Sequence, residues 1–127
     1  MVGACIEVHR ELGPGLLEST YEECLCYELS QRGIPFRRQV PIPITYKGVA
    51  LDCGYRIDVL AAGSLAVELK AVERVLPIHI AQTLTYLRLG GFSEALLINF
   101  NVTSLRQGVR NLTLKDLSDL PDLPVKR

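Results

Sequence analysis

Apolar positions at the start of the chain follow a helical period. Residues 2–12 keep the i, i+3, i+4, i+7 spacing of an amphipathic helix. A Gly-Pro-Gly sequence then ends this helix, since glycine and proline together favour a sharp turn. A second helix is predicted from Leu16 to Arg32, with Gly33 as its stop. The two helices are expected to pack against each other as one unit.

The middle of the chain follows the two-residue period of strands. Residues 36–46, 49–60 and 65–72 alternate between apolar and other side chains, as strands of a half-buried sheet do. Turn signals separate these strands, Tyr46-Lys-Gly-Val49 before the second and Ala61-Ala-Gly-Ser64 after it. Two prolines in the first strand restrict it to a sheet edge or to irregular pairing.

The last third of the chain predicts a helix followed by a buried strand. Pro77 opens a third helix that runs to about Leu89. Residues 92–100 form a short, strongly apolar strand that is expected to be buried on both faces. A helical turn over 104–110 and a last short strand over 109–114 follow. The order ααβββαβ predicts an α/β (α+β) fold, with a mixed central sheet flanked by helices.

Composition is typical of one packed domain. The chain has 127 residues, 48% hydrophobic and 22% charged, which is enough for one domain and argues against disorder. Residues 1–115 are expected to form this domain, and 116–127, with their prolines and alternating charges, a loosely held tail. No apolar run approaches the roughly 20 residues of a membrane span. The start lacks a signal-peptide pattern, which predicts a cytoplasmic protein without membrane contact.

Charge and cysteine content narrow the function classes. The net charge is zero, which counts against a protein that binds nucleic acid mainly through bulk electrostatics. A local basic patch is still compatible with a net charge of zero. The four cysteines have no C-x-x-C spacing and lie mostly at apolar positions, so we expect reduced, mostly buried thiols.

The strand pair formed by residues 55–71 carries four charged residues, Arg56, Asp58, Glu68 and Lys70. The alternation places Ile57 and Val59 on one side of the first strand and Asp58 on the other. On the second strand, Glu68 and Lys70 share one side, about 7 Å apart along the strand. Two carboxylates that meet in a sheet repel each other unless a cation lies between them.

A divalent cation beside a lysine suggests phosphodiester hydrolysis. Mg²⁺ or a similar hard cation such as Mn²⁺ takes oxygen ligands and usually needs only one or two carboxylates. A neighbouring lysine can orient or deprotonate an attacking water and stabilise charge on a phosphate. The simpler alternative is a solvated strand face with one cross-strand salt bridge. Apolar flanks favour burial of these charges instead, where an unpaired charge is costly.

These positions carry a family resemblance. Asp58, Glu68 and Lys70 match the pattern of the PD-(D/E)xK nuclease superfamily, in which an Asp ends one strand and an acid-x-Lys lies on the next. Gly15-Leu-Leu-Glu18-Ser-Thr-Tyr21 matches the signature of the GxxExxY proteins, a family of small proteins in that superfamily. The resemblance implies a restriction-endonuclease-like fold, with Asp58, Glu68 and Glu18 as metal ligands and Lys70 acting on the water.

A second motif lies on the third predicted helix. Gln82-Thr-Leu-Thr-Tyr86 resembles the Q-x-x-x-Y element of RecB-like and lambda-exonuclease-like nucleases. Gln82 and Tyr86 are i and i+4, so they share a helix face, and the resemblance implies that they hold substrate or support the site. His79, one turn earlier, is either a helix-surface residue or a contact to phosphate or water.

The remaining candidates each have an ordinary explanation. Glu18, with Tyr21 on the same helix face, could simply be an acid stabilised by the helix dipole. His9 fits a buried core histidine better than a ligand. Arg56 either pairs with Asp52 or reaches a phosphate. A small basic region, which either follows a nucleic-acid backbone or belongs to a solvated edge strand, consists of Arg37, Arg38 and Lys47.

The sequence therefore predicts a metal-dependent nuclease that cleaves nucleic acid, with DNA favoured by resemblance only. The neutral charge and the lack of an evident clamp leave room for a homodimer or a separate DNA-binding partner. They also support an alternative, a non-catalytic nucleic-acid-binding or regulatory module that retains the nuclease fold and acts through a partner.

Overall fold

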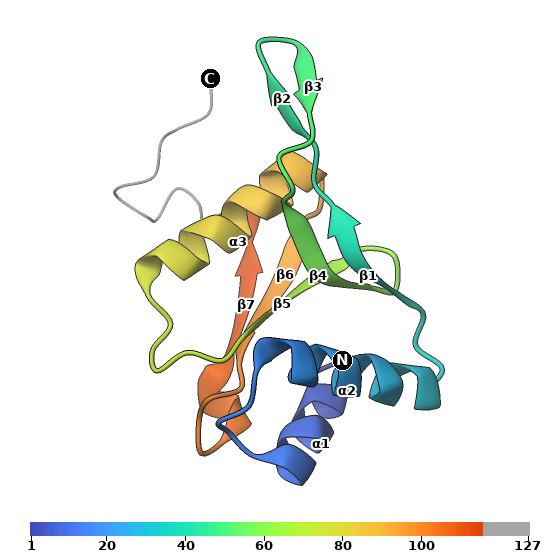
Figure 1. The fold of residues 1–127 in the computed structure, drawn as a ribbon, viewed down its shortest axis with the longest axis vertical. Helices are drawn as coiled ribbons and strands as arrows, with labels where there is room; N and C mark the ends of the chain where they lie inside the picture. Colours follow the sequence, from blue (N-terminus) through green and yellow to red (C-terminus); the bar gives the residue numbers. More distant parts are fainter. Residues whose placement is uncertain (116–127) are drawn as a thin grey trace.

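The central feature of the fold is a five-stranded sheet between two layers of helix (Figure 1). The structure is a computed structural model that describes residues 1–115. The tail predicted for 116–127 lies outside the described residues. The sheet has the order β1-β4-β5-β6-β7. Its strands are β1 (Phe36–Pro41), β4 (Arg56–Ala61), β5 (Leu65–Lys70), β6 (Glu94–Asn99) and β7 (Val109–Thr113).

The sheet is mixed, and its connections explain the helix positions. The pairs β1–β4, β4–β5 and β6–β7 are antiparallel, whereas β5 and β6 are parallel. A parallel pair needs a crossover connection, and here it contains α3 (Pro77–Gly90). The 3₁₀ turn η1 (Leu105–Gly108) leads into β7. The predicted α/β architecture and its helix and strand order are therefore confirmed for the described residues.

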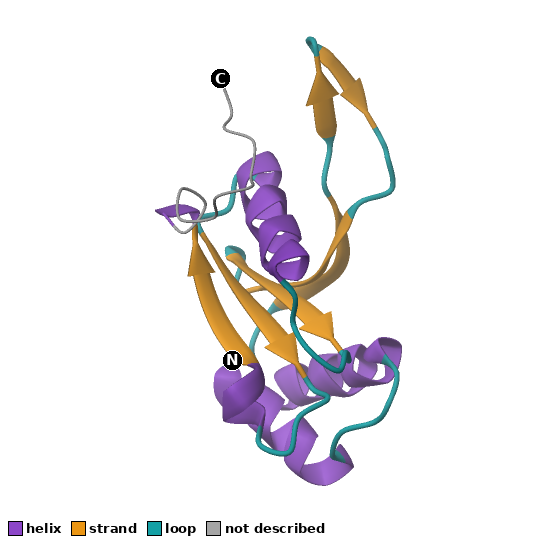
Figure 2. Cartoon of the chain, turned by 90° about the vertical axis from the view of Figure 1, so that its left-hand side faces the viewer, coloured by secondary structure: helices purple, strands orange, loops and turns teal. Residues whose placement is uncertain are grey.

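Two apolar cores form on the two faces of the sheet. The helices α1 (Val2–Leu12) and α2 (Glu18–Gln31) pack on one face, and α3 covers the other (Figure 2). On the first face Tyr21 and Phe100 are fully buried and their rings stack with centroids 4.4 Å apart. His9 is buried beside them and bonds the Val102 carbonyl at 2.8 Å, as expected of a core histidine.

The two long strands predicted over 36–46 and 49–60 are each interrupted, which the periodicity did not predict. The segments β2 (Ile44–Tyr46) and β3 (Val49–Leu51) separate from the main sheet as a two-stranded hairpin that projects from the body (Figure 1). Between β3 and β4, Gly54 adopts a φ of 81° and its N–H donates to Asp52 Oδ1 at 3.0 Å. This Asx-type turn breaks the strand.

Candidate active site

The two acids of the predicted site lie where β4 and β5 stop pairing. The last ladder pair before this point is Val59 with Val67. Beyond it, side chains take over the bonding. The Asp58 N–H donates to Glu68 Oε1 at 3.2 Å, and the Leu69 N–H donates to Asp58 Oδ2 at 2.8 Å. Each carboxylate therefore bridges to the backbone of the opposite strand, and the two are held side by side within the sheet.

Strand β4 is also irregular at Asp58. Val59 packs in the core under α1 and α2, whereas Ile57 packs in the core under α3. The prediction that these two residues share one face is therefore wrong. Opposite Asp58, Gln39 of β1 has a φ of 50°, and no ladder pair joins Gln39 and Asp58. The regular pairing of β4 with β1 is therefore interrupted at Asp58, the position at which β4 changes face.

Burial makes both carboxylates unusual. Glu68 is only 6% exposed, and burial, followed by the negative charge of Asp58, raises its pKa to about 8. Burial also raises the pKa of Asp58, and the charges of Glu22 and Glu18 act in the same direction. Both carboxylates resist ionisation because desolvation disfavours each charge and the neighbouring acids repel it.

Glu18 lies in the first turn of α2, near enough to the pair for its charge to act to raise the pKa of both acids. Its Oε2 accepts the Ala71 N–H, just beyond β5, at 3.2 Å. Tyr21 fixes the preceding loop, because its hydroxyl donates to the Gly13 carbonyl at 2.6 Å and accepts the Leu16 N–H at 3.2 Å. The positions of Glu18 and Tyr21 in the G-x-x-E-x-x-Y motif are thus coupled, because the buried tyrosine holds the loop that places the glutamate at the end of β5.

Lys70 ends β5 on the same side of the sheet as Glu68. It is partly buried, and its positive charge acts to lower the pKa of Glu68. Among residues 1–115 no carboxylate lies within ion-pair distance of its ammonium group. Its neighbour in the parallel register is Asn99 of β6. The buried Asn99 side chain accepts the Val72 N–H at 3.0 Å and donates to the Val72 carbonyl at 2.9 Å. These two bonds fix the chain beyond Lys70.

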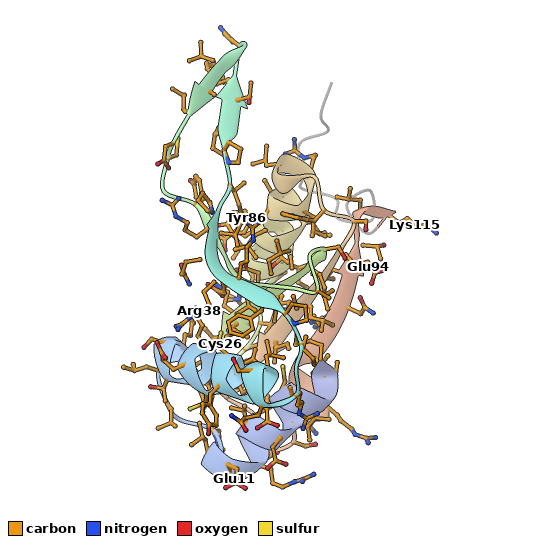
Figure 3. The ribbon with its side chains drawn as sticks, turned by 90° about the vertical axis from the view of Figure 1, so that its right-hand side faces the viewer. Glu11, Cys26, Arg38, Tyr86, Glu94 and Lys115 are labelled. Carbon is orange, nitrogen blue, oxygen red and sulfur yellow. The ribbon has the colours of Figure 1, made fainter. Side chains whose placement is uncertain are left out.

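Tyr86 lies on the third helix, α3 (Figure 3). Burial, and then the charge of Glu68, raises the pKa of the Tyr86 hydroxyl, with a smaller effect of Asp58. Its ring contacts Tyr55 with centroids 5.7 Å apart. Gln82, one turn earlier on α3, is exposed and lines the groove that Tyr86 and Tyr55 also line.

The family-model comparison matches residues 1–112 to the PD-(D/E)XK nuclease superfamily. The chain belongs to this superfamily. The mixed α/β architecture is consistent with the restriction-endonuclease-like fold. The comparisons with curated proteins and with solved structures find no match. The narrower resemblance to GxxExxY proteins stays a prediction. Among residues 1–115, no helix has the length and apolar character needed to cross a bilayer.

Members of the PD-(D/E)XK superfamily typically use divalent metals, and the carboxylates of Asp58 and Glu68 are the candidate ligands for such an ion. Within residues 1–115, no three His, Cys, Asp or Glu side chains gather closely enough to form a ready-made metal centre. Mg²⁺ nevertheless keeps several waters and binds through one or two carboxylates. The pair supplies the buried carboxylate of Glu68 and the half-buried carboxylate of Asp58, and no described residue donates a hydrogen bond to Glu68 Oε2. The pair therefore fits a hard divalent cation.

Two of the predicted site residues have other partners. Arg56 pairs with Asp52 at 3.5 Å and donates to the Tyr55 carbonyl at 2.9 Å, the first of the two alternatives the sequence offered. His79 Nδ1 accepts the Leu76 N–H at 2.9 Å and so caps the start of α3. Neither bond joins these residues to Asp58 or Glu68.

A series of side-chain hydrogen bonds through Arg38, Glu22 and Gln39 leads to Asp58, and the sequence did not predict it. Glu22 is buried and accepts from Arg38 Nη2 at 2.8 Å, so Arg38 of the predicted basic region is engaged by acids. Gln39 Nε2 donates to Glu22 Oε1 at 2.7 Å and lies 3.5 Å from Asp58 Oδ1. The available signal was that Glu22 is i+4 from Glu18 on one helix face. Gln39 gave no signal, since its role depends on its positive φ.

Proposed function

We propose that this protein is a divalent-metal-dependent nuclease that hydrolyses phosphodiester bonds, with DNA as the favoured substrate. The observation that carries the proposal is the pair of buried Glu68 and half-buried Asp58 at the opening between β4 and β5, with Lys70 on the same strand as Glu68. Apolar burial of two acids destabilises a fold that has no use for them. A cation between them removes that cost, and membership of the superfamily indicates the reaction that such a cation serves.

Each residue has a part in this proposal. Asp58 and Glu68 would hold Mg²⁺ or Mn²⁺, with Glu18 completing the acidic cluster from α2. The bound ion would supply Lewis-acid stabilisation of the phosphate and a more acidic water. Lys70 would position the attacking water or take up its proton, and its ammonium form would stabilise charge on the phosphate oxygens. Gln82 and Tyr86 would hold the substrate beside the metal.

The neutral net charge of the chain supports a role for a partner or a second copy in the complete reaction. Net charge is zero, so the phosphate backbone gains little from the bulk field of the molecule. A homodimer or a separate DNA-binding subunit would add the missing contacts. We place this activity in the cytoplasm, as the sequence predicts.

The decisive experiment is a cleavage screen with Mg²⁺ and Mn²⁺ over linear, circular, single-stranded and branched DNA and RNA. Lys70→Ala should lower the cleavage rate at least about 100-fold, the lower end of the range that general acid–base groups contribute. Arg10→Ala is the control, since Arg10 is an exposed basic residue on α1 that pairs with Glu7. Metal-dependent cleavage that survives Lys70→Ala or Asp58→Ala would defeat the assignment.

Calorimetric titration separates the enzyme from its alternative. Binding of Mg²⁺ or Mn²⁺ that disappears in Glu68→Gln is expected of the nuclease. If neither ion binds the wild-type chain, the non-catalytic nucleic-acid-binding or regulatory module becomes the better description.

A further inference from the structure

An apolar groove lies beside the proposed site, between α3 and the segment that joins β3 to β4. Its volume is about 460 Å³, at the lower end of the range for pockets that hold a single small molecule. The side chains that shape it include Ile44, Cys53, Tyr55, Ile78, Gln82 and Tyr86. None of its lining residues is charged, so the groove is poorly suited to a phosphate.

Tyr55 connects the groove to the two carboxylates. It lies in the groove wall against the Tyr86 ring and directly precedes β4, the strand that carries Asp58. The charges of Glu68 and Asp58 also act to raise the pKa of Tyr86, which agrees with this closeness. A group in the groove would therefore belong to the same molecule as a phosphate held at Asp58 and Glu68, and would be attached close to that phosphate. In a nucleic acid, the group next to a phosphate that is planar, largely uncharged and of this size is a nucleobase.

The chemistry of the walls agrees with a base. Tyr55 is 45% exposed and meets Tyr86 at an interplanar angle of 51°, so the two rings are tilted and are not stacked face to face on each other. Proteins hold unpaired bases by stacking them on such aromatic faces. Gln82 is exposed at the same groove, and its carboxamide offers one donor and one acceptor group to a base edge.

We propose that this groove binds one unpaired nucleobase next to the phosphate that is cleaved, with Tyr55 as the stacking platform. The inference rests on the proposed nuclease function and deepens it, because a base inside a duplex is stacked and paired and cannot enter the groove without leaving its partner. The substrate class is then single-stranded nucleic acid, or a duplex whose end or junction supplies an unpaired nucleotide.

The first test uses a neutral ligand and no metal, so it does not depend on catalysis. The full chain, labelled with ¹⁵N, is titrated with 2′-deoxyadenosine, and amide shifts are followed by NMR, with 2-deoxyribose as the non-aromatic control. Shifts should be confined to α3 and to the segment around Tyr55. Tyr55→Ala should weaken binding about 5- to 150-fold, the range for loss of one stacking aromatic. Tyr46→Ala, an exposed tyrosine on the projecting hairpin outside the groove, should leave binding unchanged.

The second test uses cleavage. A single strand that lacks one base beside the cleaved phosphate should be a poorer substrate than the intact strand for the wild type and for Tyr55→Phe. For Tyr55→Ala the two strands should be equal. If cleavage occurs and Tyr55→Ala behaves like Tyr46→Ala, the groove inference is wrong and the nuclease stands. If the nucleoside binds at Tyr55 but no nucleic acid is cleaved, the nuclease proposal fails and the base site stands. Nucleoside shifts outside the groove, or none, would overturn the inference.

Discussion

Asp58 and Glu68 are joined through the backbone, since the Asp58 N–H donates to Glu68 Oε1 at 3.2 Å. The Asp58 carboxylate in turn accepts the N–H of Leu69, the residue after Glu68. The two acids thus replace ladder bonds that β4 and β5 lose where the strands separate. Their placement is part of the sheet, so a change in their charge is expected to act on folding stability as well as on chemistry.

The pH dependence of stability follows from Glu68. Its folded-state pKa of about 8 lies above the ordinary value of 4.5, so between these values the folded protein binds more protons than the unfolded chain. Stability must then fall as pH rises through this window. In metal-free buffer, Glu68→Gln should become steadily more stable relative to the wild type between about pH 5 and pH 8. Urea unfolding of both proteins across that range measures the difference, and parallel pH profiles would contradict the prediction.

Metal affinity is expected to have the opposite pH dependence. A ligand carboxylate must lose its proton before it binds the ion. With the Glu68 pKa at about 8, Mg²⁺ affinity should rise with pH below that value, by up to tenfold per unit, and level off above it. Calorimetry in buffers of different ionisation enthalpy counts the released proton. Mg²⁺ binding of constant affinity from pH 6 to pH 8 would show that Glu68 is already ionised or is not a ligand.

Gly108 is expected to tolerate no side chain. A Cβ at this position would overlap the carbonyl oxygen of Asn99, which is backbone and has no rotamer to change. Gly108→Ala should therefore lower the free energy of unfolding by at least about 2 kcal/mol, as overpacking in a core does. Thermal unfolding measures the loss. Gly48→Ala at the hairpin turn is a useful comparison, because its cost comes from a positive φ of 81° with no clash.

Much of this fold could be predicted because its elements keep a regular period. The three helices and the strand β6 lie within a few residues of their predicted bounds. The side of β5 that carries Glu68 and Lys70 was also predictable from alternation. Alternation failed at Asp58, where the regular pairing of β4 with β1 is interrupted opposite Gln39, a residue distant in sequence. The hairpin turn at Tyr46-Lys-Gly-Val49 was predicted. Its separation from the main sheet was not, because its strands keep the period-two pattern across the breaks on either side.

The buried tyrosine of the G-x-x-E-x-x-Y motif supplies the last prediction. Tyr21→Phe keeps the ring that stacks on Phe100 but removes the hydroxyl that bonds Gly13 and Leu16. Two backbone groups lose their partner, which should cost about 1–2 kcal/mol of unfolding free energy. The released loop should also deliver Glu18 less firmly to the end of β5. Mg²⁺ affinity is therefore expected to fall several-fold, more than the small change in stability alone would cause in a fully folded sample.

Tyr27→Phe on the same helix is the matched control, because Tyr27 is 67% exposed and its hydroxyl has no hydrogen bond among the described residues. Calorimetry with Mg²⁺ at pH 8 compares the two variants, and Glu18→Gln sets the size of the effect expected when the third carboxylate is lost. If Tyr21→Phe binds Mg²⁺ as the wild type does while Glu18→Gln binds it weakly, the tyrosine stabilises the fold alone. If both bind normally, Glu18 lies outside the metal site, and the loop before α2 has no part in the chemistry.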